Sequence, residues 1–252
     1  MTVMSVQIAV ISDIHGNIWA LREVLADINA RGIERIVNLG DSLYGPLAPV
    51  ETAELLIIKG ILSVCGNEDR NLIEETDRAD ISETLRYVRD VLGAEHFHWL
   101  KSLPFSTTAY NEFFLCHGTP MRDDEYLFWN ILRNGKARKS ERELLDMLQS
   151  IDEPIVLCGH DHTPNTVRLS ETNIIVNPGS VGLQAYTDDT PYPHFMETGD
   201  PRARYSIISR NKSGWIVENI AIDYDWESAA RTAEKNNRPD WARWLRTGRA
   251  DG

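Results

Sequence analysis

The sequence has few cysteines, no long apolar run and no excess of basic residues. Its three cysteines, Cys65, Cys116 and Cys158, are an odd number at low density, which argues against a disulfide framework. A cytoplasmic location is therefore the expectation. The best membrane candidate, "AELLIIKGILSV", is interrupted by Lys59 and is too short to span a bilayer. The N-terminal "MTVMSVQIAVISD" lacks a basic region, so we interpret it as a first strand rather than a signal peptide.

Acidic residues outnumber basic ones, and the formal net charge is −12. This balance argues against a surface for duplex nucleic acid, which usually needs a basic face. It leaves open a small anionic substrate, because a bound metal can outweigh nearby carboxylates. The 252 residues show no clean internal boundary, and we expect a single domain over residues 1–252.

Short runs rich in Ile and Val recur along the chain, each followed by a turn with glycine and a polar residue. They alternate early with helical patterns such as "NIWALREVLADINARG", which is typical of α/β proteins. After residue 153 strands follow closely, and we assign them to a second, more antiparallel sheet: 155–158, 165–169, 173–177, 204–210 and 214–222. The expected architecture is a four-layer α/β/β/α sandwich of two mixed sheets flanked by helices.

Three further segments complete this prediction. Residues 187–204 are rich in proline, glycine and acids, and we expect an exposed loop. The chain should end in helices within 226–247, at 226–235 and 239–247. "YLFWNIL" (126–132) is interpreted as a core helix, with an aromatic wall for a nucleobase as the alternative. The basic run 133–142 is interpreted as a loop and the start of a solvated helix.

Polar residues with metal-binding groups follow several of the expected strands. They are Asp13, His15, Asp41, Asn67, His117, His160 and His162. Taken singly, each is an ordinary turn, cap or hydrogen-bonded residue. Together, however, they should converge, because sites in α/β sheets form at the carboxyl ends of strands. Seven ligands are too many for one four-coordinate zinc and are typical of two ions bridged by a carboxylate.

Five short blocks, in order, carry a family resemblance: "SDIHGN", "NLGDS", "CGNED", "CHGTP" and "CGHDH". They resemble the metal-binding blocks of the calcineurin-like metallophosphoesterases, over about residues 7–182. "LYGP" after Asp41 and "NPGSVG" at 177–182 are similar to the small prokaryotic phosphodiesterase branch of that family.

The resemblance implies roles for individual residues. It implies one metal site at Asp13, His15 and His162, a second at Asn67, His117 and His160, and Asp41 as the bridge. It implies two divalent or mixed-valence ions, with manganese favoured and iron, zinc or nickel as alternatives. A metal-bridging hydroxide would then attack phosphorus.

One position departs from the family pattern. Glu68 stands where many members have the histidine that assists the leaving group. We assign proton transfer to His162 or Glu68, beside the catalytic Asp41, and substrate contacts to Asn67, Arg70 and Tyr44.

The expected activity is hydrolysis of a small phosphorylated substrate, with a phosphodiester favoured over a monoester and a nucleotide among the options. The alternatives are a dinucleoside polyphosphate hydrolase, a phosphoprotein phosphatase and a catalytically silent metal-binding scaffold. A scaffold should expose a large apolar patch. No membrane partner is expected, and a homo-oligomer is left open.

Overall fold

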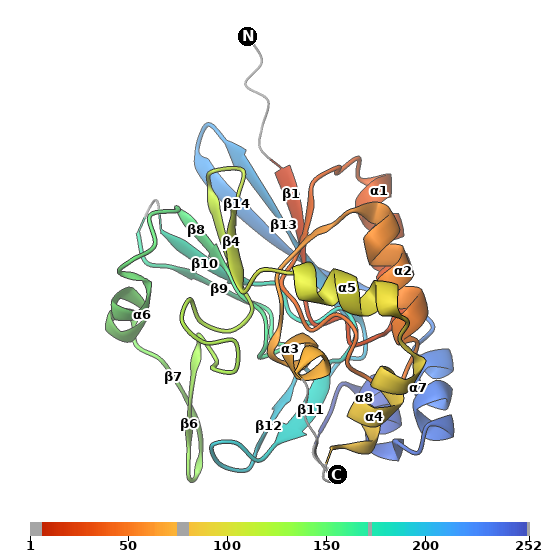
Figure 1. Cartoon of the computed structure of the whole chain (residues 1–252). Coiled ribbons are helices and arrows are strands. Elements are labelled where there is room, and N and C mark those ends of the chain that lie inside the picture. The colour runs from red at the N-terminus through yellow and green to blue at the C-terminus, as the bar shows by residue number, and fades with distance from the viewer. Residues whose placement is uncertain (1–6, 75–80, 171–172, 251–252) are drawn as a thin grey trace.

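The computed structural model of the chain describes residues 7–74, 81–170 and 173–250. Within them, two five-stranded mixed sheets pack face to face with helices outside, so the predicted fold class is confirmed (Figure 1). Residues 1–6 and 251–252 of the expected domain lie outside this description. None of the described helices is long and apolar enough to cross a membrane.

The first sheet has a parallel centre built from the N-terminal strands. β1 (Gln7–Ile11), β2 (Ile36–Asn38) and β3 (Leu62–Ser63) run parallel, and the order of the sheet is β14-β13-β1-β2-β3. β13 (Ala203–Asn211) pairs antiparallel with β1, and β14 (Gly214–Ile222) with β13. The assignment of 204–210 and 214–222 to the second sheet was therefore wrong, because these strands cover the free edge of β1.

The second sheet repeats this plan. β5 (Phe113–Cys116), β8 (Ile155–Leu157) and β10 (Ile174–Asn177) run parallel at its centre. β4 (Ser106–Ala109) and β9 (Asn165–Arg168) pair antiparallel at its two edges. The sheet is thus mixed, and it draws two strands from before residue 153 that the sequence pattern did not assign to it.

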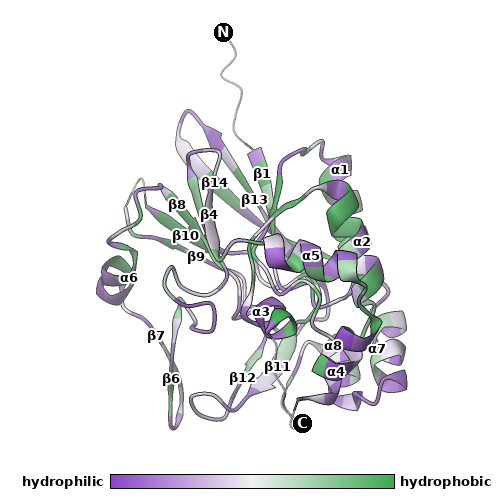
Figure 2. Ribbon diagram, viewed as in Figure 1, coloured by the Kyte–Doolittle hydropathy of each residue, from purple (hydrophilic) through white to green (hydrophobic). Residues whose placement is uncertain are grey.

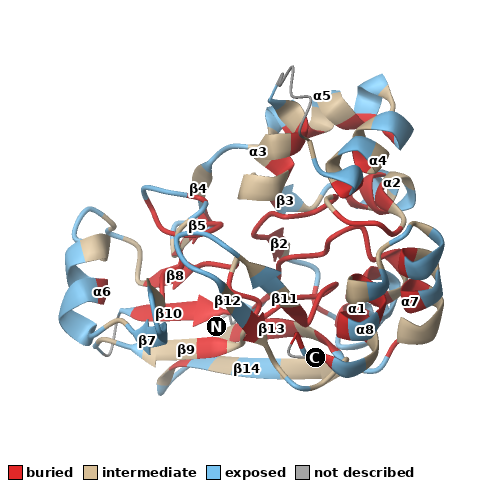
Figure 3. Cartoon of the chain, turned by 90° about the horizontal axis from the view of Figure 1, so that it is seen from below, coloured by how far each residue is buried: buried red, intermediate tan, exposed pale blue. Residues whose placement is uncertain are grey.

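Side-chain alternation explains the four layers. In β1, Ile8 and Val10 face the second sheet and pack with Phe113, whereas Ala9 and Ile11 face the helices on the other side. Those helices are α1 (Ile18–Ala30), α2 (Pro49–Lys59), α7 (Trp226–Lys235) and α8 (Pro239–Thr247). The outer face of the second sheet is covered by α6 (Glu141–Leu148). Figure 2 shows the hydrophobic strands, and Figure 3 shows that buried residues concentrate between the helical layers.

Three short helices lie between the first and second sheets in the sequence. α3 (Asn67–Ile73) begins directly after β3, and α4 (Glu83–Val91) and α5 (Ala94–Ser102) follow it. Leu72, Val88 and Leu100 join them in a small apolar cluster with Leu43. This cluster holds the start of α3, where Asn67 lies, against the loop that follows β2.

Two segments differ from their predicted structure. Residues 129–138 form a hairpin of β6 (Trp129–Leu132) and β7 (Gly135–Arg138) rather than a core helix and a loop. Asn134 and Gly135 favour a tight turn, which outweighs the helical spacing of the preceding apolar residues. The expected loop at 187–204 contains a second hairpin, β11 (Ala185–Asp188) and β12 (His194–Glu197), anchored by buried Met196. α7 and α8, in contrast, occupy the segments expected for them.

We predict that the packing between the sheets dominates the free energy of unfolding. Phe113 is fully buried there, and its ring meets that of Trp215 edge-on at 5.4 Å. Replacing Phe113 by Ala should lower the free energy of unfolding by about 3–5 kcal/mol, because it leaves a cavity. The matched control is Phe105→Ala, since Phe105 is 42% exposed, and it should cost about 1 kcal/mol or less. Urea titration checks both values, and equal losses would contradict the prediction.

Candidate metal centre

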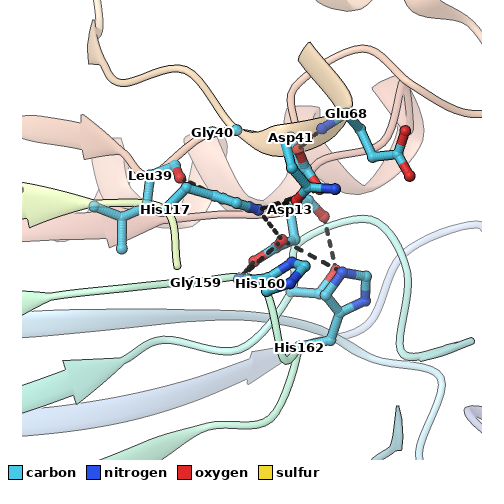
Figure 4. A network of polar contacts seen from close by, with 12 residues as sticks. Asp13, Leu39, Gly40, Asp41, Glu68, His117, Gly159, His160 and His162 are labelled. Atoms are coloured by element: carbon cyan, nitrogen blue, oxygen red, sulfur yellow. Dashed lines mark hydrogen bonds and ion pairs between the residues drawn. The ribbon is translucent and has the colours of Figure 1, made fainter. Parts of the chain in front are cut away.

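The seven polar residues singled out from the sequence meet at one edge of the two sheets. Asp13 and His15 follow β1, Asp41 follows β2, and Asn67 opens α3 after β3. His117 follows β5, while His160 and His162 follow β8. The expected convergence at strand ends is confirmed, and Figure 4 shows the side chains of Asp13, Asp41, His117, His160 and His162 around one point.

These residues form two buried clusters that each suit a metal ion. One comprises Asp13, His15 and His162, and the other comprises Asp41, His117 and His160. In each cluster the ligand atoms lie within 4.8 Å of one another. The Oδ1 atom of Asn67 lies 3.0 Å from His117 Nε2, beside the second cluster.

Asp41 lies between the two clusters. Its Oδ2 atom is 3.3 Å from His117 Nε2 and 4.0 Å from His15 Nε2. Its Oδ1 atom accepts a hydrogen bond from the backbone N–H of Glu68 at 2.9 Å. One carboxylate therefore faces both groups, as the bridging position requires.

The backbone at these positions is strained. A positive φ is uncommon for residues other than glycine, yet it occurs at five of the seven: Asp13, His15, Asp41, His160 and His162, with φ between 51° and 70°. Such strain persists only where the surrounding structure enforces it, and it clusters at functional sites. The strands thus end in tight loops that turn successive polar side chains toward one point.

Backbone carbonyls orient three of the imidazole rings. The Nδ1–H group donates to a carbonyl oxygen in each: His15 to Tyr44 at 2.8 Å, His117 to Leu39 at 2.8 Å and His162 to Leu183 at 2.7 Å. A carbonyl oxygen only accepts hydrogen bonds, so the proton sits on Nδ1 and the neutral ring keeps a lone pair on Nε2. A metal-ligating histidine is usually oriented in this way, by a hydrogen bond from the ring nitrogen that does not bind the metal.

The clearest sign of a metal is the contact between His15 and His162. Their Nε2 atoms lie 3.1 Å apart, and when both rings are neutral each directs a lone pair at the other. Burial and the neighbouring His162 lower the pKa of His15 to about 4, so His15 itself stays neutral near neutral pH. A cation held by His15 and His162 would remove this repulsion. Imidazoles, carboxylates and an amide oxygen together suit ions such as manganese, iron, zinc or nickel, and the geometry is consistent with a dinuclear centre.

The two clusters contain histidines whose pKa values are shifted in opposite directions. Burial opposes the charged form of His117, but Asp41 and Asp13 raise its pKa to about 10. Burial and the nearby His117 lower the pKa of His160 to about 4. Burial acts to raise the pKa of Asp41, but His117 and His15 keep it well below its usual value. A proton on His117 thus occupies the position that faces Asp41.

Two glycines in the quoted blocks are required by close packing. A Cβ at Gly66 would lie 2.1 Å from Asp41 Oδ1, and one at Gly159 would lie 2.0 Å from Ser12 Oγ and 2.8 Å from Asp13 Oδ2. Any side chain at these positions would displace a carboxylate of the centre. The glycines of "CGNED" and "CGHDH" therefore bring neighbouring strands close enough for their polar residues to meet.

Supporting residues that the sequence analysis missed hold the loops in place. Buried Asp69 accepts hydrogen bonds from the backbone N–H groups of Ser42 and Gly66, joining the loops after β2 and β3. Asn177 donates to the Gly159 carbonyl at 2.8 Å, which accounts for the first residue of "NPGSVG". Asp69 stands within "CGNED" and could have been suspected from its place in the first turn of α3.

Two tyrosines distant in sequence pack on the histidines. The Tyr126 ring lies 4.6 Å from that of His160, and the Tyr186 ring lies 4.5 Å from that of His162. The Tyr186 hydroxyl donates to the His160 carbonyl at 2.9 Å and lies 2.7 Å from the Tyr126 hydroxyl, with which it forms a second hydrogen bond. Tyr126 belongs to the segment for which an aromatic wall was the alternative to a core helix, whereas the sequence pattern gave no sign of Tyr186, which β11 brings here.

The residues between and around the ligands mostly have structural partners. Asp161 points away from the clusters, as expected, and accepts from Thr163 and Asn177. Burial raises the pKa of Cys116 to about 12, so its thiol stays protonated. His96 accepts from the Gly93 N–H at the start of α5.

The residues expected to contact substrate are divided between two cavities. Asn67, Tyr44 and Glu68 line a cavity of about 280 Å³ that also contains His15, Asp41, His160 and His162. Its remaining wall includes side chains from the C-terminal segment: Arg238, Asp240, Trp241 and Trp244. Arg70 instead lines a neighbouring cavity of about 570 Å³. Asp123 holds its guanidinium through two hydrogen bonds of 2.7 and 3.1 Å.

Glu68 is close to the clusters without joining them. Its carboxyl group extends away from the metal-binding side chains in Figure 4 and accepts from Asn71 at 3.3 Å. Burial, with a smaller contribution from Asp41, raises its pKa to about 8. It therefore presents a carboxyl group to the first cavity.

The sequence matches the calcineurin-like phosphoesterase superfamily domain over residues 6–197. The chain belongs to this superfamily. It is thus a hydrolase of a metal-dependent phosphoesterase family, and its two His/Asp clusters lie in the matched region. Residues after 197, which supply Arg238, Trp241 and Trp244 to the first cavity, lie beyond the match.

Several known proteins are similar over nearly the whole chain. An uncharacterized protein of Methanocaldococcus jannaschii is 28% identical over 249 residues, covering 93% of this chain and 94% of that protein. The crystal structure of a metallophosphoesterase from Sphaerobacter thermophilus has a TM-score of 0.76 at 25% identity and covers 97% of this chain and 100% of that one. A hypothetical protein from Pyrococcus horikoshii OT3 shares the fold, with a TM-score of 0.73 at 19% identity, covering 97% of this chain and 99% of that one.

We predict that loading the metal-free protein with Mn²⁺ releases about one proton near neutral pH, because His117 must lose its proton to become a ligand. The raised pKa of His117 means that this proton is bound at every pH below about 10, so the affinity for metal should rise with pH over that range. His15 and His160, with pKa values of about 4, contribute none. Calorimetry in buffers of different ionisation enthalpy counts the protons.

The control for this prediction is Glu68→Gln, which removes another nearby group that titrates close to neutral pH. The variant should still release about one proton if His117 is the source. Binding of Mn²⁺ with no proton release would contradict the assignment.

Proposed function

We propose that this protein hydrolyses phosphodiesters with two metal ions. Asp13, His15 and His162 would hold one ion, Asn67, His117 and His160 the other, and Asp41 both. The observation that carries the proposal is the pair of facing Nε2 lone pairs on His15 and His162, 3.1 Å apart. Manganese suits a set that combines carboxylates and an amide oxygen with imidazoles, and iron, zinc and nickel are the alternatives.

Two divalent ions at this site would supply Lewis acidity for the phosphoryl oxygens and activate water near neutral pH. The protein's own part is to keep the ligands in place before the substrate arrives. The carbonyls of Tyr44, Leu39 and Leu183 fix the three imidazole rings. The Glu68 N–H fixes the Asp41 carboxylate. Such preorganised groups need little rearrangement during the reaction.

Geometry favours Glu68 over His162 as the group that assists the leaving group. The Nδ1–H of His162 is used by the Leu183 carbonyl, and its Nε2 faces Asp13 Oδ1 at 3.3 Å. Both ring nitrogens are therefore committed to the centre. The Glu68 carboxyl group lines the first cavity and is within reach of a substrate there. We assign proton transfer to Glu68.

The two cavities support a diester over a monoester. They share Asn67, His160 and Asp188, so space for an organic group is available on each side of the proposed centre. A monoester needs one such space, whereas a diester needs two. A dinucleoside polyphosphate also has two arms and is the alternative substrate. A cytoplasmic location and a homo-oligomer stay predictions, as does a phosphoprotein substrate.

The scaffold alternative predicted an exposed apolar patch, and the surface does carry an apolar groove between α2 and α5. Ile57 and Ile58 line it, and Ile58 is 80% exposed. The groove shares no residue with either cavity beside the metal clusters. It is thus compatible with catalysis and does not account for the facing histidines.

We predict that metal-free protein hydrolyses bis(p-nitrophenyl) phosphate only after Mn²⁺ is added, and faster than p-nitrophenyl phosphate. Asp41→Asn should lower kcat by about a hundredfold or more, because the variant loses the charge that faces both clusters. Release of p-nitrophenolate measures the rates, and atomic emission counts the bound metal. Full activity in the metal-free protein would refute the two-metal proposal.

The role of Glu68 predicts a dependence on the leaving group. p-Nitrophenolate leaves without a proton, whereas an alkoxide requires one. Glu68→Gln should therefore leave kcat for methyl p-nitrophenyl phosphate nearly unchanged. It should lower kcat for other diesters increasingly as the leaving group becomes more basic, by about a hundredfold for the alkoxide of a dialkyl diester. Rates for a series of leaving groups test this. Equal losses across the series would show that Glu68 does not transfer a proton.

A further inference from the structure

The second cavity extends away from the reacting centre. The first cavity contains five of the seven proposed ligands, whereas the second contains only Asn67 and His160. Its volume of about 570 Å³ is twice that of the first and within the usual range for small-molecule sites. It is thus large enough to hold a substituent of the substrate rather than the phosphorus itself.

Cations distinguish this cavity from its neighbour. Arg70 of α3, Arg122 of the loop after β5 and Lys139 after β7 all line it. The wall of the first cavity has one arginine or lysine, Arg238, against four carboxylates. The chain as a whole has a net charge of −12, so three cations from separate segments around one cavity are unusual. Of the two cavities, the second is therefore the better binding site for an anionic group.

Neighbouring carboxylates hold these cations in fixed positions. Asp123 binds Arg70, and Asp124 binds Arg122 through contacts of 3.0 and 3.1 Å. The wall also includes Asp124, Glu125 and Asp188, so attraction for a ligand depends on directed N–H groups more than on net charge. A guanidinium has five N–H donors, and each of these pairs leaves some of them for a further acceptor.

Lys139 is the most enclosed of the three. Its side chain is 6% exposed, and its ammonium donates to the Tyr126 carbonyl at 2.6 Å and to Glu125 Oε1 at 3.0 Å. An ammonium carries three N–H donors, so one has no acceptor among the residues that the structure describes. A buried cation with a spare donor, beside two arginines, is the arrangement that binds phosphate oxygens.

We propose that the second cavity binds a phosphate group carried by one substituent of the diester, through Arg122 and Lys139. The preferred substrate is then a phosphodiester with an additional phosphate on one arm, as in a nucleotide that is phosphorylated at a second position. This inference rests on the proposed function. It assigns the basic segment 133–142 a part in recognition, because Lys139 belongs to it.

Two chromogenic substrates that differ by one phosphate test the proposal. Thymidine 5′-(p-nitrophenyl phosphate) and its 3′-phosphorylated form share the same scissile bond. With Mn²⁺, the wild-type protein should show a KM about tenfold lower for the phosphorylated form. Arg122→Gln and Lys139→Gln should each remove most of this preference. Arg122 is 63% exposed, so its replacement does not threaten folding.

The matched control is Arg202→Gln. Arg202 also pairs with an aspartate two residues away, Asp200, but lines neither cavity. This variant should keep the tenfold preference. Equal KM values for the two substrates in the wild-type protein would overturn the proposal, as would a preference that persists in both cavity variants.

Binding separates failure of this proposal from failure of the proposed function. If neither substrate is hydrolysed, the proposed function fails. Calorimetry then compares thymidine 3′,5′-bisphosphate with thymidine 5′-monophosphate on the Mn²⁺-loaded protein. Tighter binding of the bisphosphate that Arg122→Gln abolishes supports the cavity as a phosphate site. Equal binding overturns it.

Discussion

The structure depends on one electrostatic constraint: lone pairs from several strands are directed at a common point inside the protein. The carbonyl partner of each ring leaves Nε2 of His15, His117 and His162 without a proton when the ring is neutral. Carboxylates of Asp13 and Asp41 lie among them. Without a cation this arrangement is repulsive, and the raised pKa of His117 shows one response to it. Binding of metal ions at this point would therefore stabilise the folded protein.

The four-layer architecture supplies the rigidity that such an arrangement requires. Both sheets have parallel centres whose strands end at the same edge, and each sheet is buried on two faces. The loops at that edge adopt strained left-handed conformations at five of the seven proposed ligands. Gly66 and Gly159 allow neighbouring loops to approach within contact distance of Asp41 and Asp13. Packing that lies far from the polar residues thus sustains their local strain.

Elements outside the metal-binding blocks shape the surroundings of the centre. The β11–β12 hairpin contributes Tyr186, and the loop after β5 contributes Tyr126. α8 and the turn before it add Arg238, Trp241 and Trp244 to the first cavity, and Arg70, Arg122 and Lys139 line the second. The superfamily match ends at residue 197, before the C-terminal part of this wall. Several side chains that line the two cavities therefore come from outside the metal-binding blocks.

The sequence alone determined the fold class, the superfamily and the group of polar residues that converges. It could do so because short apolar strands and the residues directly after them are local features, and the carboxyl ends of parallel strands meet at one edge. The spacing of Asp13 and His15, or of His160 and His162, is visible without coordinates.

Only the tertiary structure decided the remaining features, because they depend on contacts between distant segments. The pairing of β13 with β1 depends on which sheet edge is free, so it could not be read from the strand pattern. The 126–132 segment has helical spacing, but its turn and its partner β7 make residues 129–132 a strand. Arg70 is three residues from Asn67, yet Asp123 draws it into the second cavity. Likewise, Asp69 and the two tyrosines support the centre through hydrogen bonds and ring contacts that no local pattern encodes.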